Sequence, residues 1–435
     1  MNENALILTG KLDDNTQDIP FFDYLYVFVL IIYAGLGSTF VRSFGTEKPM
    51  AVLLPVGFSI ILALKNKVVF NKQIYILLFC YLLYYGATAI KYKALHPVFF
   101  GELVASFLVT YITIKGLRFN FFLIYERLIY YLSIIALVMW LIQLALGGDN
   151  LLNLLGIIPS IDTYSQVTGG GRNIIIYSVQ PYIHMFASFT TIPRNSGFAW
   201  EPGGFSVFLN LAIFINLFIV KSEKKFNSRF WILLLALLSS QSTTGYVIFI
   251  LVMIFYLLQK KIKIILLLFP VLILGIAFLF SLPFMRDKIL LYIEEANKVD
   301  MIVEESVGKE KSRGPQRFAS FLIAFRDFQN NPILGYAGQP EERWYIKLKA
   351  NIAPISGIGN LMARYGLVGF IFFMTLMINS SRAYSKYFNY KGEYLFLLIM
   401  LLITISYSII LIPLIMSFWM FSFFENCDPE ESKTK

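Results

Sequence analysis

The sequence predicts an all-α, polytopic integral membrane protein, a helical bundle with about twelve transmembrane helices and two long extracytoplasmic loops. Hydrophobic residues make up 57% of the 435 residues and charged residues only 15%, a balance too apolar for an ordinary soluble protein. The apolar residues fall into runs long enough to cross roughly 30 Å of hydrocarbon. Lysine and arginine collect in short loops between these runs, as the positive-inside rule describes. We therefore expect a single integral membrane domain over residues 1–435.

Several other classes of protein are excluded by what the chain contains. The net charge of +10 is distributed over short loops between apolar runs, so it orients the chain in a membrane and does not indicate nucleic acid. The two cysteines, Cys80 and Cys427, provide neither a disulfide framework nor a cysteine metal site. No phosphate-binding loop motif or metalloprotease motif occurs, and two histidines cannot build a histidine-rich metal site. We expect no metal and no cofactor.

The first part of the chain predicts five spans. Residues 1–19 lack the basic region of a cleavable signal peptide, so we expect the first span to be retained. The five apolar runs are Phe21–Val41, Met50–Leu64, Ile74–Ile90, Pro97–Ile114 and Leu128–Leu146.

Basic residues in two short loops give the direction of these spans. The loops after the second and fourth spans are predicted to be cytoplasmic, since they carry Lys65, Lys67 and Lys72, and Lys115, Arg118 and Arg127. The fifth span then leaves the cytoplasm, and residues 147–203 form the first long extracytoplasmic loop.

The middle of the chain predicts four more spans. The sixth, Gly204–Val220, returns to a basic cytoplasmic cluster. Residues 230–258 are interrupted by the polar stretch Ser239–Gly245, so they form either two short spans with a tight turn or one broken helix. We favour two spans, because that choice places the lysines after residue 259 on the cytoplasmic side of the membrane. A ninth span is expected over about 264–282.

Residues 283–355 form the second long extracytoplasmic loop. Two sets of periodic apolar positions predict short amphipathic helices at the outer membrane boundary, with a turn at Pro332–Gly335. These positions are Ile289, Tyr292 and Ile293, and Phe318, Phe321, Leu322 and Phe325. A tenth span follows at Ile358–Ile378. Residues 394–424 form two short spans hinged near Tyr407–Pro413, or one long tilted span.

The stretch Arg194–Gly204 places charged and glycine-rich residues at the entrance of the sixth span. Pro202 suits a first helical turn and keeps Glu201 out of helical geometry. The carboxylate of Glu201 is favoured there by the helix dipole, and Arg194 either pairs with it or binds an anionic substrate. The alternative is a purely structural arrangement, in which Glu201 caps the helix or anchors Arg194.

Several short motifs follow one another along the chain, each at a defined position relative to the spans. They are Arg194–Phe198 leading to Glu201–Gly204, Ser242–Gly245, Asn331–Tyr336, and Asn360 before Arg364–Gly369. Together with the two long outer loops, they resemble the O-antigen polymerase (Wzy) family, relatives of the O-antigen ligases. The resemblance spans most of the chain.

This resemblance implies a GT-C-like membrane glycosyltransferase of the O-antigen polymerase/ligase superfamily, at the periplasmic face of the bacterial inner (cytoplasmic) membrane. The implied enzyme is a polysaccharide polymerase, for O-antigen or capsule. It would transfer a growing glycan from polyprenyl (undecaprenyl) diphosphate onto a sugar hydroxyl of another lipid-linked repeat unit. The implied partners are the lipid-linked oligosaccharide, membrane lipid and a chain-length regulator protein, and no nucleic acid.

Two alternatives stay open: an O-antigen ligase that transfers glycan to a lipid acceptor, and a flippase or transporter of lipid-linked oligosaccharide. Charges inside the spans are few, chiefly Asp23 and Glu102, which argues against a proton-coupled transporter. The ligase branch is expected to carry a histidine in its second long outer loop. Residues 283–355 contain none, which favours the polymerase.

The implied chemistry selects the candidate site residues. A departing diphosphate needs cationic stabilisation, which planar guanidinium groups provide through bidentate contacts. The candidates are Arg172, Arg194, Arg313 and Arg317. In the second loop each arginine could instead pair with a nearby acid. Glu201 is the candidate general base for the acceptor hydroxyl. His184 and Asn360 are further candidates for substrate binding, although a lone loop histidine is often only a hydrogen-bonded surface residue.

Overall fold

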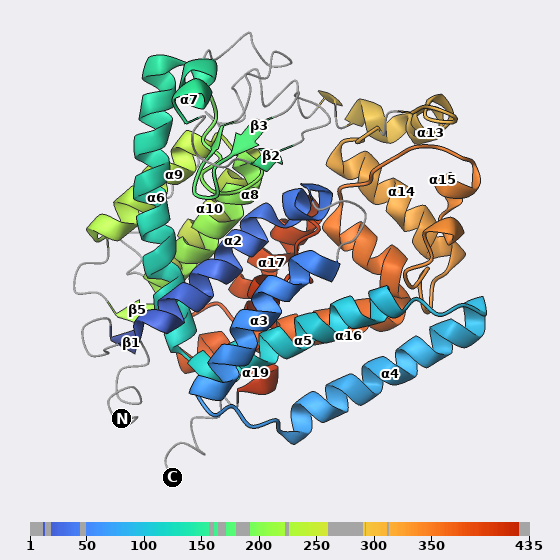
Figure 1. Ribbon diagram of the computed structural model, residues 1–435, viewed down its shortest axis with the longest axis horizontal. Helices are drawn as coiled ribbons and strands as arrows, with labels where there is room; N and C mark the ends of the chain where they lie inside the picture. Colours follow the sequence, from blue (N-terminus) through green and yellow to red (C-terminus); the bar gives the residue numbers. More distant parts are fainter. Residues whose placement is uncertain are drawn as a thin grey trace.

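The computed structural model describes a bundle of α-helices with a small helical module at one end (Figure 1). The described residues are 12–13, 19–43, 49–155, 161–163, 171–179, 192–221, 226–259, 290–291, 293–310 and 313–425. The prediction of an all-α polytopic membrane protein is confirmed. Within the described part of the chain, five helices are long and apolar enough to cross a membrane, and five shorter helices are also apolar.

The five spans expected in the first part of the chain all appear as helices. Asn71 caps the third of them, because its side chain accepts hydrogen bonds from Gln73 N and Ile74 N. Pro97 occupies the first turn of the fourth, where a missing N–H costs nothing. The helices are α2 (Phe21–Ser43), α3 (Pro49–Lys65), α4 (Lys72–Tyr92), α5 (Pro97–Leu117) and α6 (Asn120–Leu146).

The helix α8 (Pro202–Phe214) lies at the centre of the bundle and is buried along its whole length. It continues as the π-helical turn η2 (Ile215–Ile219). Two helices rather than one follow it, α9 (Ser228–Ser240) and α10 (Thr243–Leu258). Ser242 caps α10 by accepting from Gly245 N, and its hydroxyl is also 3.0 Å from that of Ser206 in α8. This polar turn is therefore attached to the central helix.

The last part of the chain forms one long helix and three short ones. These are α16 (Gly357–Tyr387), α17 (Leu395–Ser406), α18 (Pro413–Trp419) and α19 (Phe421–Phe424). The helical structure is interrupted between α17 and α18 at residues 407–412, a segment that we call the hinge. Of the two arrangements considered for residues 394–424, the structure has the one with short segments. The expected ninth span, 264–282, lies outside the described residues.

The second long loop contains a module with its own small core of Val303, Ile323, Tyr345, Ala350 and Ile352. Its helical segments are α13 (Val299–Glu305), α14 (Arg317–Asn330), the 3₁₀ turn η3 (Pro340–Glu342) and α15 (Trp344–Lys347). The amphipathic helix expected near Phe318–Phe325 exists as α14.

The face of α14 that packs on the protein is formed mainly by small residues. Phe318 is 52% exposed, whereas Ala319, Ile323 and Ala324 are fully buried. A Cβ placed on Gly359 of α16 would lie 3.0 Å from the Cβ of Ala324, so the two helices pack closely through small residues. Of the large apolar residues that predicted this helix, Phe318 is exposed, while Phe321, Leu322 and Phe325 are partly buried.

Short strands and one short helix lie outside the bundle helices and the outer module. The strands β1 (Leu12–Asp13) and β5 (Val220–Lys221) pair in parallel. Three more, β2 (Ile161–Thr163), β3 (Gly171–Asn173) and β4 (Ser178–Val179), form an antiparallel sheet in sequence order. They follow α7 (Gly148–Leu154) in the first long loop.

Charged residues within the spans are paired. Lys65 Nζ lies 2.6 Å from Asp23 Oδ1, and Arg364 Nη2 lies 3.5 Å from Glu102 Oε2. The carboxylate of Glu126 is fully buried and is contacted by Arg229 at 3.1 Å. Pairing offsets the cost of removing such charges from water. These groups therefore have a structural explanation that requires no transported proton.

The helix α16 is broken at Gly366, where φ is 63° and ψ is −160°. The break frees backbone groups that a continuous helix would pair internally, and residues 332–337 of the second loop satisfy them. The four bonds are Tyr336 N to Ala363 O, Ala337 N to Arg364 O, Leu367 N to Pro332 O, and Val368 N to Ile333 O. Two of the sequence motifs, Asn331–Tyr336 and Arg364–Gly369, thus lie in direct contact.

We expect Gly366→Ala to destabilise the protein by at least about 1–3 kcal/mol, the cost of a strained backbone position. A Cβ there would also lie 2.3 Å from Ile333 O. The matched control is Gly101→Ala in α5, because a Cβ at Gly101 meets nothing within 4 Å and alanine favours a helix. Thermal unfolding of the purified proteins in detergent measures the stability of both variants. Equal melting temperatures for the two variants would contradict the requirement for glycine at position 366.

The segments expected outside the cytoplasm lie on one side of the molecule. In Figure 1, α13, α14 and α15 share the upper side with α7, β2 and β3, while β1, β5 and α19 lie at the lower side. The hydroxyls of Tyr84 and Tyr92, at the far end of α4 from the cytoplasmic lysines, donate to Leu334 O and Gly335 O of the second loop.

We therefore predict that residues 283–355 face outward and residues 388–393 face the cytoplasm. In a protein with both native cysteines replaced by serine, Lys309→Cys should react with a membrane-impermeant maleimide in intact spheroplasts. Lys391→Cys should react only after lysis. Both lysines are exposed, so accessibility within the fold does not limit the comparison. The reverse labelling pattern would show that the bundle is inverted.

Candidate active site

A small polar cavity of about 50 Å³ lies where α8, the α9–α10 turn, α14 and the hinge meet. Its wall combines two arginines, one carboxylate and several hydroxyl groups. The lining residues are Arg194, Glu201, Pro202, Gly203, Ser242, Thr243, Thr244, Arg317 and Tyr407. Three of the residues proposed from sequence, Arg194, Glu201 and Arg317, are thus brought together from separate segments.

Glu201 precedes α8 in an extended conformation, with φ −154° and ψ 158°. Its side chain makes no capping hydrogen bond to the helix, so the carboxylate does not serve as a helix cap. Instead Oε1 lies 3.4 Å from Nη2 of Arg317. The side chain remains 39% exposed, which leaves room for a further contact.

Arg317 is the first residue of α14 and is held from three directions. Its Nη2 donates to the hydroxyl of Tyr407 at 3.0 Å, and its Nη1 donates to the carbonyl oxygen of Ser406. The guanidinium carbon lies 4.2 Å from the centre of the Tyr407 ring, close enough for a cation–π contact. Because these contacts fix the plane of the guanidinium, Arg317 presents its donors in one orientation.

Arg194 reaches the cavity from the other side. Its Nε donates to Ser240 O at 3.3 Å, and the side chain is half-buried. Within the described part of the chain it forms no ion pair, so Glu201 is bound by Arg317 rather than by Arg194. Burial lowers the pKa of Arg194 from its ordinary value, and nearby Arg317 lowers it further, while Glu201 opposes both effects. An anionic ligand would relieve this unfavourable burial of positive charge.

The segment before Glu201 is buried and held by its polar groups. The amide of Asn195 donates to Ser239 Oγ at 2.9 Å and accepts from Gly197 N at 2.9 Å. Trp200 N donates to Gly35 O in α2 at 3.0 Å. Buried backbone groups need such partners, and here they come from elements on both sides of the segment. The positions of Arg194 and Glu201 are therefore set by the bundle.

Gly203 provides space for Tyr407. A Cβ at Gly203 would lie 1.7 Å from the Tyr407 hydroxyl oxygen, so a side chain at this position would displace the ring beneath Arg317. This close approach explains a glycine in the first turn of α8. Sequence reasoning missed Tyr407 as a site residue, and its only signal was its position at the expected hinge.

Two other predicted residues, Arg313 and Asn360, lie outside this cavity. Arg313 Nη1 pairs with Glu305 at 2.6 Å on the exposed surface of the outer module. Asn360 Oδ1 accepts from Arg343 Nη2 at 3.4 Å, and its amide donates to Pro354 O. Arg172 belongs to β3, but its side chain lies outside the described residues, as does all of His184.

Comparison with known proteins gives one match. Residues 229–374 match the family model described as O-Antigen ligase. This segment contains Arg317 and the turn at Ser242–Thr244, whereas Arg194, Glu201 and Tyr407 lie outside it. No curated protein and no solved structure matches the chain. The match confirms the resemblance and supports a membrane enzyme of O-antigen or glycan assembly. The chain is therefore a multi-pass membrane protein whose residues 229–374 match the O-antigen ligase family model, which supports the O-antigen polymerase/ligase superfamily.

Proposed function

We propose that the protein is a polysaccharide polymerase that extends O-antigen or capsular glycan on a polyprenyl diphosphate carrier. The observation that carries this proposal is the convergence of Glu201, Arg194 and Arg317 on one cavity. A carboxylate next to two guanidinium groups suits a reaction in which a hydroxyl loses a proton while a diphosphate departs.

In the proposed reaction, an acceptor sugar hydroxyl attacks the anomeric carbon of the donor glycan. A bond forms between the hydroxyl oxygen and that carbon, while the bond from the carbon to the diphosphate oxygen breaks. The hydroxyl proton passes to Glu201, and the diphosphate leaves with the bonding electron pair. Arg194 and Arg317 stabilise the negative charge on the leaving group through charge-assisted hydrogen bonds.

The cavity geometry supports separate tasks for the two arginines. Arg317 is fixed by Tyr407 and Ser406 and touches Glu201, so it can orient the carboxylate as well as bind phosphate. Arg194 has no carboxylate partner among the described residues. It therefore has donors to offer an anion without first breaking an ion pair.

The main alternative is a ligase, which performs the same transfer onto a different lipid acceptor. The family that residues 229–374 match is described as O-Antigen ligase, which favours the ligase. The lack of histidine in residues 283–355 favours the polymerase. Purified protein with a synthetic polyprenyl diphosphate repeat unit as its only substrate would separate them. A polymerase gives a ladder of lengthening products. Transfer that occurs only after a lipid acceptor is added indicates a ligase, and donor moved unchanged across a vesicle membrane indicates a transporter.

We expect Glu201→Gln to lower the transfer rate by about 10²- to 10⁴-fold, the usual loss on removing a general base. Glutamine keeps the size and much of the hydrogen bonding, so the fold and the position of Arg317 should be retained. The matched control is Glu304→Gln, an exposed carboxylate of the outer module, which should leave the rate unchanged. A rate within a few-fold of wild type for Glu201→Gln would leave this residue with a structural role only.

Arg317→Lys should lower the transfer rate by about 10- to 100-fold, because a charged hydrogen bond is worth roughly 1.5–3 kcal/mol. Lysine keeps the charge but cannot reproduce the planar contacts to Tyr407 and Ser406. The control is Arg326→Lys on the same helix, whose guanidinium contacts Asp300 and the Trp344 ring outside the cavity.

The same loss is expected for Arg194→Lys. Diphosphate binding to the purified variants should weaken in parallel with the transfer rate. If both lysine variants gave wild-type product lengths and rates, these arginines would be removed from the site.

A further inference from the structure

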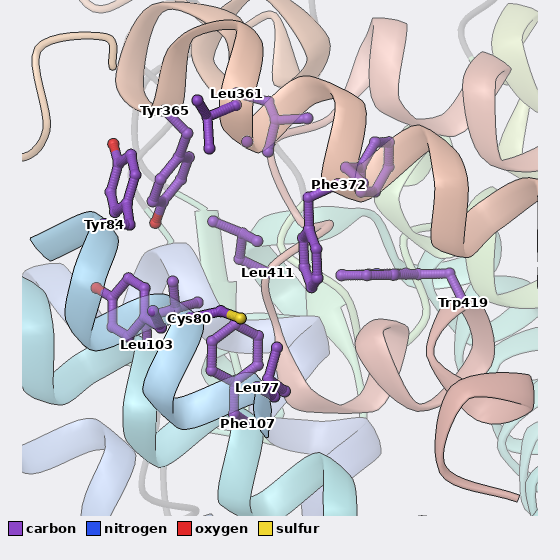
Figure 2. Close-up of a pocket in the computed structure, with 14 residues that line it drawn as sticks. Leu77, Cys80, Tyr84, Leu103, Phe107, Leu361, Tyr365, Phe372, Leu411 and Trp419 are labelled. Atoms are coloured by element: carbon purple, nitrogen blue, oxygen red, sulfur yellow. The ribbon is translucent and has the colours of Figure 1, made fainter. Parts of the chain in front are cut away.

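A second cavity, of about 130 Å³, lies between α4, α5 and α16 (Figure 2). Unlike the first, its wall is almost entirely apolar and is rich in aromatic rings. Figure 2 shows Leu77, Cys80 and Tyr84 of α4 facing Leu361, Tyr365 and Phe372 of α16. Leu411 of the hinge and Trp419 of α18 complete the wall.

The cavity reaches the apolar outer surface of the bundle. Three of its lining residues, Cys80, Val368 and Phe372, are themselves exposed. The neighbouring face of α4 is also apolar and exposed at Phe79 and Leu83. An apolar surface of this kind on a membrane-spanning helix faces hydrocarbon, so a lipid chain can enter the cavity sideways without crossing water.

The apolar cavity is connected to the polar one by the hinge, which lines both, and by α16, which packs against the hinge. On the hinge, Tyr407 lines the polar cavity and Leu411 lines the apolar cavity. On α16, a Cβ at Gly357 would lie 2.0 Å from Tyr407 O, and Leu361 one turn later lines the apolar cavity. The two cavities are therefore neighbours, one suited to charge and the other to hydrocarbon.

We propose that this cavity binds the isoprenoid units of the polyprenyl carrier that lie next to its diphosphate, an inference that rests on the proposed function. One molecule with a charged head and an apolar chain would fill both cavities at once. Rigid aromatic walls give a defined shape that suits branched, unsaturated isoprene units. Because the cavity is small, it holds only the first part of the chain, and the remainder lies against the exposed faces of α4 and α16.

Photo-crosslinking tests this assignment. A polyprenyl diphosphate with a diazirine in its first isoprene units is added to wild-type protein in phospholipid nanodiscs, and labelled peptides are identified by mass spectrometry. We expect labels on α4 between Leu77 and Tyr84 and on α16 between Leu361 and Phe373. Unmodified carrier at a concentration of about ten times its Kd should reduce labelling about tenfold, since only about one site in eleven then remains free of competitor.

A variant pair at one position provides the control. Cys80→Trp should fill the cavity and reduce crosslinking, while Cys80→Ala should leave it open and label as wild type does. Cys80 is exposed, so neither change requires the core to repack. The KM for the carrier should rise in Cys80→Trp with kcat little changed, which a general loss of folding would not produce.

The other outcomes overturn the inference in distinguishable ways. Equal labelling of the same peptides by a phosphatidylethanolamine with a diazirine in its acyl chain would show a general lipid site. Crosslinks elsewhere, with glycan transfer intact, would reject the cavity but leave the proposed function standing. Absence of both transfer and carrier crosslinking would reject the proposed function itself.

Discussion

The need of every buried backbone amide for a hydrogen-bond partner determines where this bundle departs from regular helix. In hydrocarbon no water can supply that partner, so each irregular segment must find one in the protein. The break at Gly366 is satisfied by residues 332–337, and the segment before α8 by contacts to α2 and α9. The segment before α8 lines the polar cavity, and Tyr365, next to the break at Gly366, lines the apolar one.

Ion pairing and exposure distinguish the charges within the spans from those of the polar cavity. Asp23, Glu102 and Glu126 each have a basic partner and lie away from the polar cavity. Glu201 also has a partner in Arg317, but it keeps exposed surface, and Arg194 beside it has no carboxylate within the described part of the chain. The cavity therefore carries an excess of positive charge, which a bound diphosphate would neutralise.

Much of the fold could be predicted from local patterns. Apolar runs indicated the helices, and Ser239–Gly245 indicated two helices where one was conceivable. Long-range contacts could not be predicted in this way, because nothing near Tyr407 in the sequence points to Arg317. For α14 periodicity predicted the helix and its apolar positions, but it could not predict that the small residues Ala319 and Ala324 are buried where α14 packs on α16. Glu201, Arg194 and Arg317 could be proposed together only because each lies next to a span end or in an outer loop.

The polar contacts between α4 and the second loop have a mechanical consequence. Tyr84, Tyr92 and Lys91 bind residues 331–335, and the same segment is bonded to α16 across Gly366. Moving α4 away from α16 must therefore either break these three side-chain bonds or carry the loop along. Since α14 ends at Asn330, displacement of the loop would pull on the helix that carries Arg317. Under the proposed carrier binding, movement of α4 at the entrance for the lipid chain would therefore be transmitted through residues 331–335 to the helix that carries Arg317.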